Sequence, residues 1–125
     1  MKFWVYNTEM EKLKPFTAQR PWGGFREFIE NEVATVKILF VKKGEVFSLQ
    51  RHDHRDEFWR ILVGNPEVTI SDKIIKAKTG DELEIPPETN HRISATIDDV
   101  EILEISRGQF AEDDIVRIKD KYGRA

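Results

Sequence analysis

Residue types that bind divalent metal ions gather within the stretch SLQRHDHRDEFW, residues 48–59. Side chains alternate across a strand, so Gln50 and His52 share one face. The short interval DHRD before Glu57 is expected to form a hairpin that brings Glu57 near His52. A fourth ligand must come from elsewhere, and His91 is the only histidine outside this stretch. Together these side chains offer two imidazoles and two oxygens, a donor set that suits zinc, manganese, iron or nickel.

The same stretch also fits a charged hairpin tip that contains histidine by chance. Two histidines one residue apart are common in surface hairpins, and this spacing alone does not separate the two interpretations. A metal site requires that His91 lie beside the stretch, which depends on the elements that carry these residues.

Short β-branched and aromatic runs fill the chain between residues 33 and 107, and glycine, proline and aspartate separate them. No helical period of apolar residues occurs there. Evenly spaced short strands of this kind predict an all-β sandwich or barrel. The expected strands cover residues 33–41, 45–52, 57–64, 66–71, 73–78, 81–86, 91–96 and 100–106.

Both ends of the chain are expected to add short extensions to this barrel. The first twenty-odd residues could supply an edge strand or pack over the barrel, and a helical turn at residues 112–114 is expected before an extended tail. Trp22 and Trp59 are expected to serve the core, because aromatic side chains dominate small cores. The other apolar residues near the amino terminus are Phe3, Trp4, Val5 and Phe16.

Length and composition exclude several classes of protein. A chain of 125 residues fits one domain, expected over residues 1–125 with the core barrel at about 33–107. The net charge of −3 comes from interspersed acidic and basic residues, which argues against a nucleic-acid partner. The absence of cysteine excludes disulfides and thiolate metal sites. No stretch approaches the roughly 20 apolar residues of a membrane span, so we expect no membrane partner and a cytoplasmic location.

One segment resembles the first sequence motif of the cupin superfamily, G-x5-H-x-H-x3,4-E-x6-G. Gly44, His52, Glu57 and Gly64 fall in register with it, and Gln50 stands in place of the first histidine. The resemblance implies a cupin fold, which is a double-stranded β-helix or jelly-roll barrel.

A second segment, GDELEIPPETNH, resembles the second cupin motif, G-x5-P-x-G-x2-H-x3-N, through Gly80, Pro86 and His91. Glu88 stands where that motif has glycine, and Ala95 stands where it has asparagine. These departures affect the turn more than the ligands. The motif glycines themselves are expected to serve turns.

The resemblance narrows to the cupin domain of type II phosphomannose isomerases, through strings that occur in the same order. They are RPWG at 20–23, SLQRHDHRDEFW at 48–59, IPPETNHR at 85–92 and EDDIVRIKDKYGR at 112–124. In that family a glutamine replaces the first cupin histidine as a ligand. The resemblance therefore implies that Gln50, His52, Glu57 and His91 hold one divalent ion, with zinc first and manganese, iron or nickel as alternatives.

This resemblance also implies an activity, the metal-dependent interconversion of mannose 6-phosphate and fructose 6-phosphate by a mannose-6-phosphate isomerase. Family members often fuse the domain to a mannose-1-phosphate guanylyltransferase, for which we expect no room here. The reaction needs a base near C1 and C2 of the open-chain sugar and a group that stabilises the enediolate, which a divalent ion can do. His54 is the candidate base, because Glu57 is assigned to the metal.

A sugar phosphate also requires cationic ligands, and arginine binds phosphate through bidentate hydrogen bonds. Arg117 lies in the family-like string and is the first candidate, for binding phosphate or for stabilising developing charge. Further candidates for contact with the sugar phosphate are Arg92, Arg124 and Trp59, followed by Arg20, Arg51 and Arg55. Strand parity places Arg51 on the face opposite Gln50 and His52.

Two other functions stay open at this point, because a fold does not fix a function. One is a non-catalytic cupin that binds a sugar or another small ligand, and the other is a cupin enzyme of different chemistry such as a dioxygenase. The apolar run FWVY at residues 3–6 could supply an edge that needs cover, so a homodimer is expected.

Overall fold

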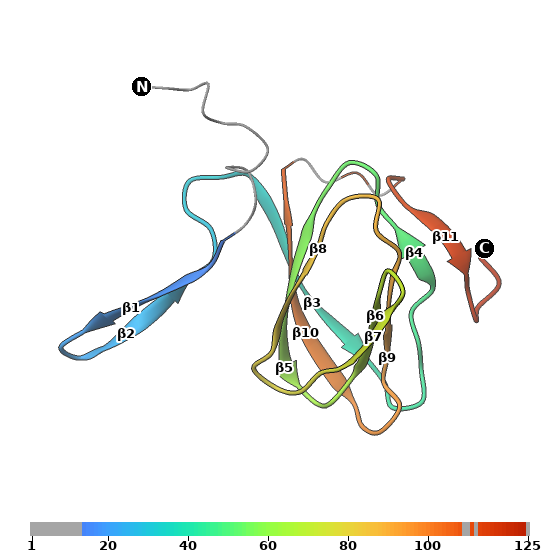
Figure 1. Ribbon diagram of the computed structural model, residues 1–125, viewed down its shortest axis with the longest axis horizontal. Coiled ribbons are helices and arrows are strands. Elements are labelled where there is room, and N and C mark those ends of the chain that lie inside the picture. Colours follow the sequence, from blue (N-terminus) through green and yellow to red (C-terminus); the bar gives the residue numbers. More distant parts are fainter. Residues whose placement is uncertain (1–13, 109–110, 112, 125) are drawn as a thin grey trace. The chain divides into compact units, whose positions relative to one another are not determined.

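The computed structural model describes residues 14–108, 111 and 113–124, and these residues form strands and no helix (Figure 1). The chain divides into two compact units, Met1–Val33 and Ala34–Ala125. None of the described elements is a helix that could cross a membrane. The strands are β1 (Phe16–Arg20), β2 (Gly23–Glu27), β3 (Ala34–Val41), β4 (Leu49–Arg51), β5 (Glu57–Val63), β6 (Glu67–Ile70), β7 (Lys73–Lys76), β8 (Glu82–Ile85), β9 (His91–Ser94), β10 (Val100–Arg107) and β11 (Val116–Lys119).

The first unit contains an antiparallel hairpin in which β1 pairs only with β2. Within the described residues this sheet includes no barrel strand, so β1 and β2 do not supply the expected edge strand. The alternative expectation, that the first twenty-odd residues pack over the barrel, stays a prediction. Trp22 lies in the turn between β1 and β2 with 73% of its surface exposed, so its predicted core role is wrong. The physical reason is that Trp22 lies at the end of a two-stranded sheet, which by itself has no second layer to cover a side chain. The run at residues 3–6 lies outside the described residues, and the homodimer stays a prediction.

The second unit is a barrel of two antiparallel sheets. One sheet has the order β3-β10-β5-β8, and the other has the order β11-β4-β9-β6-β7. All eight strands predicted between residues 33 and 107 are present, as β3 to β10. The extended tail is present as β11, which pairs with β4 and so belongs to the five-stranded sheet. Of the expected helical turn, Glu112 lies outside the described residues, while the backbone nitrogen of Asp114 donates to the oxygen of Ala111 at 3.1 Å.

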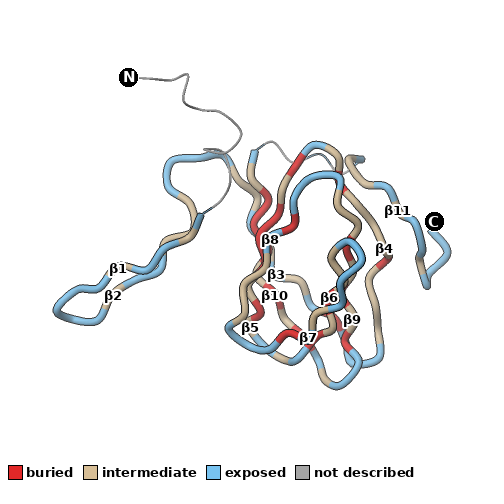
Figure 2. Tube along the Cα trace, in the orientation of Figure 1, coloured by how far each residue is buried: buried red, intermediate tan, exposed pale blue. Residues whose placement is uncertain are grey.

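Apolar side chains fill the space between the two sheets, and the buried positions follow the barrel strands (Figure 2). None of the described residues of the first unit is buried. Side chains alternate along a strand, and on β10 the buried core residues Val100 and Ile102 follow that alternation. The buried core residues are Val41, Trp59, Ile61, Val68, Ala77, Ile85, Ile93, Ala95, Val100 and Ile102.

The inward faces change from apolar to polar toward one end of the barrel. On β10 the inward residues Val100 and Ile102 are followed by Glu104 and Ser106, all buried. Such polar side chains are costly to bury without partners, so this end of the barrel is where a ligand or ion is expected.

Candidate metal centre

Three side chains with metal-binding atoms converge at the polar end of the barrel. The ligand atoms of His52, Glu57 and His91 all lie within 4.8 Å of one another, and all three residues are buried. His52 Nε2 lies 3.5 Å from Glu57 Oε2, and His91 Nε2 lies 3.7 Å from Glu57 Oε1. Two atoms bonded to one ion at about 2.0–2.2 Å with tetrahedral angles are roughly 3.3–3.6 Å apart. The distance from His52 lies in this range and the distance from His91 lies just above it, so a small shift would let the residues share an ion.

The three ligands come from both sheets rather than from one hairpin. His52 follows β4 of the five-stranded sheet, and Glu57 begins β5 of the four-stranded sheet. The expected hairpin between them is therefore wrong, because the interval at residues 53–56 carries the chain from one sheet to the other. His52 and Glu57 are still brought together, and they meet across the barrel.

Hydrogen bonds to backbone carbonyls orient both imidazoles. His52 Nδ1 lies 2.6 Å from the oxygen of Asp114, and His91 Nδ1 lies 2.9 Å from the oxygen of Thr89. A carbonyl oxygen only accepts, so each Nδ1 carries the proton and each Nε2 carries the lone pair. This second contact of a histidine is the usual support for a metal ligand.

The charge states suit the same role. Burial lowers the pKa of His52, and burial lowers the pKa of His91 to about 4, so both rings are neutral at pH 7. Burial raises the pKa of Glu57, and the nearby guanidinium of Arg55 opposes that rise. Metal ions bind neutral imidazoles and ionised carboxylates, so the two rings need lose no proton on binding.

Glu57 is held with one oxygen engaged and the other open. Glu57 Oε2 accepts hydrogen bonds from Arg55 Nε at 3.0 Å and from Ser106 Oγ at 3.3 Å. Glu57 Oε1 and His91 Nε2 are both buried, and neither has a hydrogen-bond partner within the described part of the chain. Two unsatisfied atoms that face each other at 3.7 Å are the observation that a bound cation would explain.

Gln50, the fourth predicted ligand, stands directly opposite His91 in the pairing of β4 with β9. Residues opposite each other in an antiparallel pair project to the same face, so Gln50 projects to the side of the metal centre. Its Oε1 accepts a hydrogen bond from Ser48 Oγ at 2.7 Å, which leaves a second lone pair on that oxygen.

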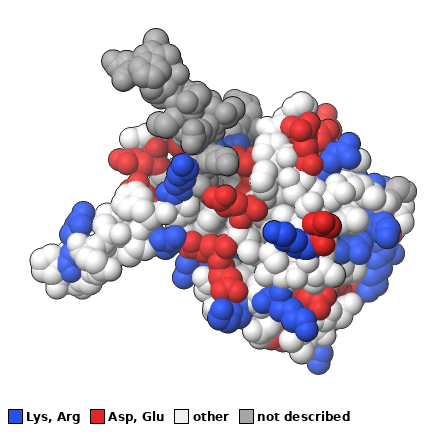
Figure 3. Space-filling view, viewed as in Figure 1, with Lys and Arg blue, Asp and Glu red and all other residues white. Residues whose placement is uncertain are grey.

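Arg117 occupies the neighbouring position on the same face, because it stands opposite Gln50 in the pairing of β11 with β4. Its Nε is buried and lacks a hydrogen-bond partner among the described residues. In Figure 3 basic side chains lie among acidic ones, and several gather on the side of the barrel where β11 runs in Figure 1. The structure thus places a guanidinium with an unused donor next to the candidate ligands.

The other predicted site residues lie elsewhere. His54 is exposed, and its backbone nitrogen donates to Asp114 Oδ2 at 3.1 Å. Arg92 donates through Nε to the oxygen of Phe47 at 3.0 Å, and it follows His91 on the opposite face of β9. Arg124 forms an exposed pair with Asp120 through Nε at 2.7 Å. These three side chains are not brought into the cluster.

Trp59 lies against the cluster and within the core. It is buried, and its ring meets the ring of His91 edge-on at 5.5 Å between centroids. Its Nε1 donates to Glu104 Oε2 at 3.2 Å. The predicted core role of Trp59 is confirmed, and the ring forms a wall of the metal centre.

Sequence reasoning missed Glu104, and it named Arg55 only as a secondary candidate for contact with the sugar phosphate. Burial, together with the charge of Glu57, raises the pKa of Glu104 to about 7. The signal for Glu104 is strand parity, which puts it on the same face as Val100 and Ile102. Arg55, which is 9% exposed, lies in an irregular segment where no parity applies, so only the structure shows its contacts with Glu57 and His52.

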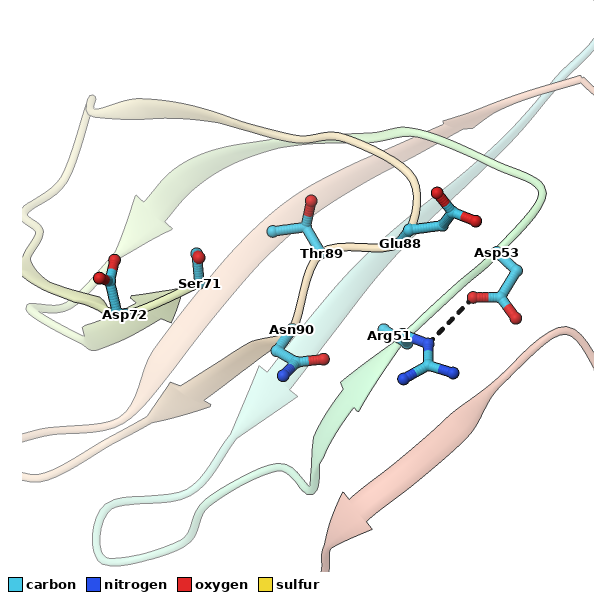
Figure 4. A pocket seen from close by; sticks show the side chains of 7 residues that line it. All are labelled: Arg51, Asp53, Ser71, Asp72, Glu88, Thr89 and Asn90. Atoms are coloured by element: carbon cyan, nitrogen blue, oxygen red, sulfur yellow. Dashed lines mark hydrogen bonds and ion pairs between the residues drawn. The ribbon is translucent and has the colours of Figure 1, made fainter.

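A separate polar pocket of about 730 Å³ shares a turn with the metal centre (Figure 4). The turn at residues 87–90 holds both histidines, since the nitrogen of Glu88 donates to the oxygen of His52 at 2.7 Å and Thr89 accepts from His91. Arg51 lies in this pocket, paired with Asp53 at 3.1 Å, as expected from its parity opposite Gln50. The pocket is lined by Arg51, Asp53, Ser71, Asp72, Glu88, Thr89 and Asn90.

A barrel of two antiparallel sheets with two histidines and a glutamate converging at one end defines a cupin. Solved structures share this fold, among them an oxalate decarboxylase of Bacillus subtilis, with a TM-score of 0.64 and 24% identity over 70% of this chain and 25% of the other. The capsular polysaccharide assembling protein CapF of Staphylococcus aureus gives a TM-score of 0.63 and 18% identity over 85% of this chain and 34% of the other.

Within the cupins the chain belongs to the family described as mannose-6-phosphate isomerase C-terminal, whose model matches residues 7–120. A mannose-1-phosphate guanylyltransferase of Escherichia coli is 35% identical over 99% of this chain and 27% of its own length. The xanthan biosynthesis protein XanB of Xanthomonas campestris pv. campestris is 36% identical over 84% of this chain and 23% of its own length. The chain thus spans about a quarter of the length of these curated relatives.

The names of these relatives contradict the predicted enzyme activity. Curated relatives that match this chain are called mannose-1-phosphate guanylyltransferases, not mannose-6-phosphate isomerases, so the predicted isomerase identity is wrong. The reason is that the motifs specify the barrel and its ligand cage, and one fold serves proteins with different activities.

Proposed function

We propose that this chain is a metal-binding cupin domain that binds a phosphorylated mannose. One observation carries the proposal. Three buried polar atoms without a hydrogen-bond partner in the described residues are Glu57 Oε1, His91 Nε2 and Arg117 Nε. The first two atoms can bind a cation, and the third can donate a hydrogen bond to an anion. The centre can therefore bind a metal ion and an anionic group together.

The metal would be held by His52, Glu57 and His91, with the amide oxygen of Gln50 as a fourth ligand. Such an ion supplies a Lewis acid that binds and polarises hydroxyl or carbonyl oxygens of a sugar. Zinc is the first expected ion, because two imidazoles and a carboxylate with an open position form a common zinc donor set.

The chain's own residues would position the sugar phosphate beside that ion. Arg117 presents an unused donor on the face that carries Gln50 and His91, and guanidinium groups bind phosphate through charge-assisted hydrogen bonds. Trp59 is buried and packs edge-on against His91, so it forms the inner wall of the centre. The names of the family and of the curated relatives, which refer to mannose phosphates, support this class of ligand.

Metal content tests the first half of the proposal. The protein is incubated with zinc, freed of excess ion, and analysed by plasma mass spectrometry beside His91→Ala. We expect one ion per chain for the unaltered protein and a large loss for the variant. Arg51→Gln is the matched control, because Arg51 faces the other side of the sheet. Equal metal content in the protein and in His91→Ala would contradict the site.

Calorimetric titration of the zinc-loaded protein tests the second half, with mannose 6-phosphate, mannose and inorganic phosphate as separate ligands. Loss of a hydrogen bond to a charged group is worth about 1.5–3 kcal/mol, so Arg117→Gln should weaken binding of mannose 6-phosphate by roughly 10- to 100-fold. Arg124→Gln and Arg92→Gln should leave this affinity unchanged, since neither side chain reaches the cluster. An unchanged affinity in Arg117→Gln would remove Arg117 from the site.

A further inference from the structure

Arg55 lies among the candidate metal ligands although it carries the same sign of charge as the metal. Its Nε donates a hydrogen bond to Glu57 Oε2 at 3.0 Å, and its Nη2 lies 3.2 Å from His52 Nε2. Arg55 is 9% exposed, and the side chains of His52 and Glu57 are 3% and 1% exposed. One cation therefore already contacts two of the three converging residues.

The contact between Arg55 and His52 prevents a metal ion from binding His52 Nε2. An arginine stays protonated in proteins and only donates, so Nη2 uses the lone pair of His52 Nε2. The proton on Nδ1, which faces the oxygen of Asp114, requires the same arrangement. A neutral imidazole has one such lone pair, so Arg55 and a metal ion are alternative partners of His52.

The contact between Arg55 and Glu57 does not prevent Glu57 from binding a metal ion. Arg55 and Ser106 both donate to Glu57 Oε2, whereas Oε1 faces His91 Nε2 and has no hydrogen-bond partner in the described residues. A carboxylate can bind a metal through one oxygen and a guanidinium through the other. Arg55 can thus keep Glu57 in place while it leaves His52.

We propose that Arg55 is a positioning residue that competes with the metal ion for His52 Nε2 and holds Glu57 Oε1 toward His91. The inference rests on the proposed metal site and deepens it. Metal binding then requires the guanidinium to turn away from His52. The apparent affinity for the metal ion equals the intrinsic affinity multiplied by the fraction of molecules in which the guanidinium has turned away. The residue that aligns Glu57 thus also limits how tightly the ion is held.

Zinc affinity, measured by competition with a chromogenic chelator at pH 7.5, tests this inference without any assay of activity. If the turned conformer amounts to about a tenth of the molecules, Arg55→Gln should bind zinc about tenfold more tightly than the unaltered protein. A side chain with a merely structural role gives the opposite result, since its loss loosens the site and weakens binding. Arg51→Gln, which removes a neighbouring arginine from the other face, should leave the affinity unchanged.

A second measurement uses the unaltered protein and does not depend on whether the variant folds. In nitrogen-15 spectra of the arginine side chains, zinc should release the Nη2 protons of Arg55 into fast rotation and exchange, while the Nε proton bonded to Glu57 stays protected. Nη2 signals that do not change at zinc saturation would overturn the inference, as would an affinity in Arg55→Gln equal to or below that of the unaltered protein.

The two proposals fail in different ways. If the unaltered protein binds no zinc, or binds it equally well in His91→Ala, the metal site itself is wrong. If zinc binding depends on His91 but is not strengthened in Arg55→Gln, the metal site stands and only the competition by Arg55 is refuted.

Discussion

Gln50 stands directly opposite His91 in the antiparallel pairing of β4 with β9, which puts an amide oxygen and an imidazole on the same face of one sheet. These two residues lie 41 positions apart in the sequence, and Gln50 is also opposite Arg117 on its other side. The register of three neighbouring strands thus puts two candidate metal ligands and the guanidinium of Arg117 on one face of the sheet.

Gln50 therefore offers a direct test of this alignment. Gln50→Ala removes one of the four proposed ligands and should lower zinc affinity by about 10- to 100-fold, as loss of a supporting contact at a metal site does. Gln50→His restores a strong ligand at the same position and should bind zinc at least as tightly as the unaltered protein. The measurement is chelator competition. Equal affinities in all three proteins would show that Gln50 lies outside the coordination sphere.

The raised pKa of Glu104 predicts that the free energy of unfolding depends on pH. Its folded pKa of about 7 lies above the ordinary value of 4.5, because burial and the charge of Glu57 disfavour ionisation. A raised folded pKa means that the contribution to stability is complete below pH 4.5 and is lost as the pH rises through 7. Relative to Glu104→Gln, the unaltered protein should thus lose stability between pH 5 and 8, by an amount on the order of 3 kcal/mol at 1.36 kcal/mol per pKa unit.

This comparison is made by urea unfolding in the presence of a chelator, so that bound metal does not contribute. Glu101→Gln is the control. Glu101 lies on the same strand, and the residues opposite it on the two neighbouring strands are Phe40 and Val63, not carboxylates. Parallel pH profiles for the unaltered protein and Glu104→Gln would contradict the assigned pKa.

Glu88 predicts a stabilising substitution. Its φ of +62° lies in the left-handed region, at the position where the second cupin motif has glycine. The left-handed conformation costs a residue with a side chain about 1–2 kcal/mol, whereas glycine loses about 0.5–1 kcal/mol more backbone entropy on folding. Glu88→Gly should therefore raise the free energy of unfolding by up to about 1 kcal/mol, as measured by urea unfolding.

The matched control is Glu84→Gly, which makes the same change at an exposed position in β8. There the backbone is an ordinary strand, so the substitution should destabilise by roughly 0.5–1 kcal/mol. A destabilisation of the same size at both positions would show that the turn does not strain Glu88.

Gly64 and Gly80 predict a contrast between two glycines with similar backbone angles. Their φ values are +93° and +96°, but a Cβ on Gly64 would collide with the backbone oxygen of Asp99, whereas a Cβ on Gly80 meets nothing within 4 Å. Gly80→Ala should lower stability by about 1 kcal/mol from backbone strain alone. Gly64→Ala should lower it by more, roughly 2–4 kcal/mol, because the backbone around Asp99 must also move. Thermal unfolding of the two variants checks the order, and equal losses would contradict the collision.

The alternation of apolar residues and the turn residues between them were enough to predict the strands from β3 to β10. This succeeds because strand formation depends on local pattern, and a residue's face follows from parity alone. Parity also placed Gln50 and Arg51 on opposite faces, and the proline-containing turn pointed to His91. The absence of cysteine excluded thiolate ligands in the same direct way.

Only the tertiary structure decided how these elements meet. The expected hairpin between His52 and Glu57 is a crossing between two sheets, since pattern within a strand says nothing about which strand it pairs with. The position of Glu104 near Glu57 follows from the pairing of β10 with β5, and the irregular segment before β5 places Arg55 against both Glu57 and His52. The sequence by itself determined the strands, their faces and the types of candidate ligand. The fold decided which candidate ligands share a centre, because that depends on contacts between residues far apart in the chain.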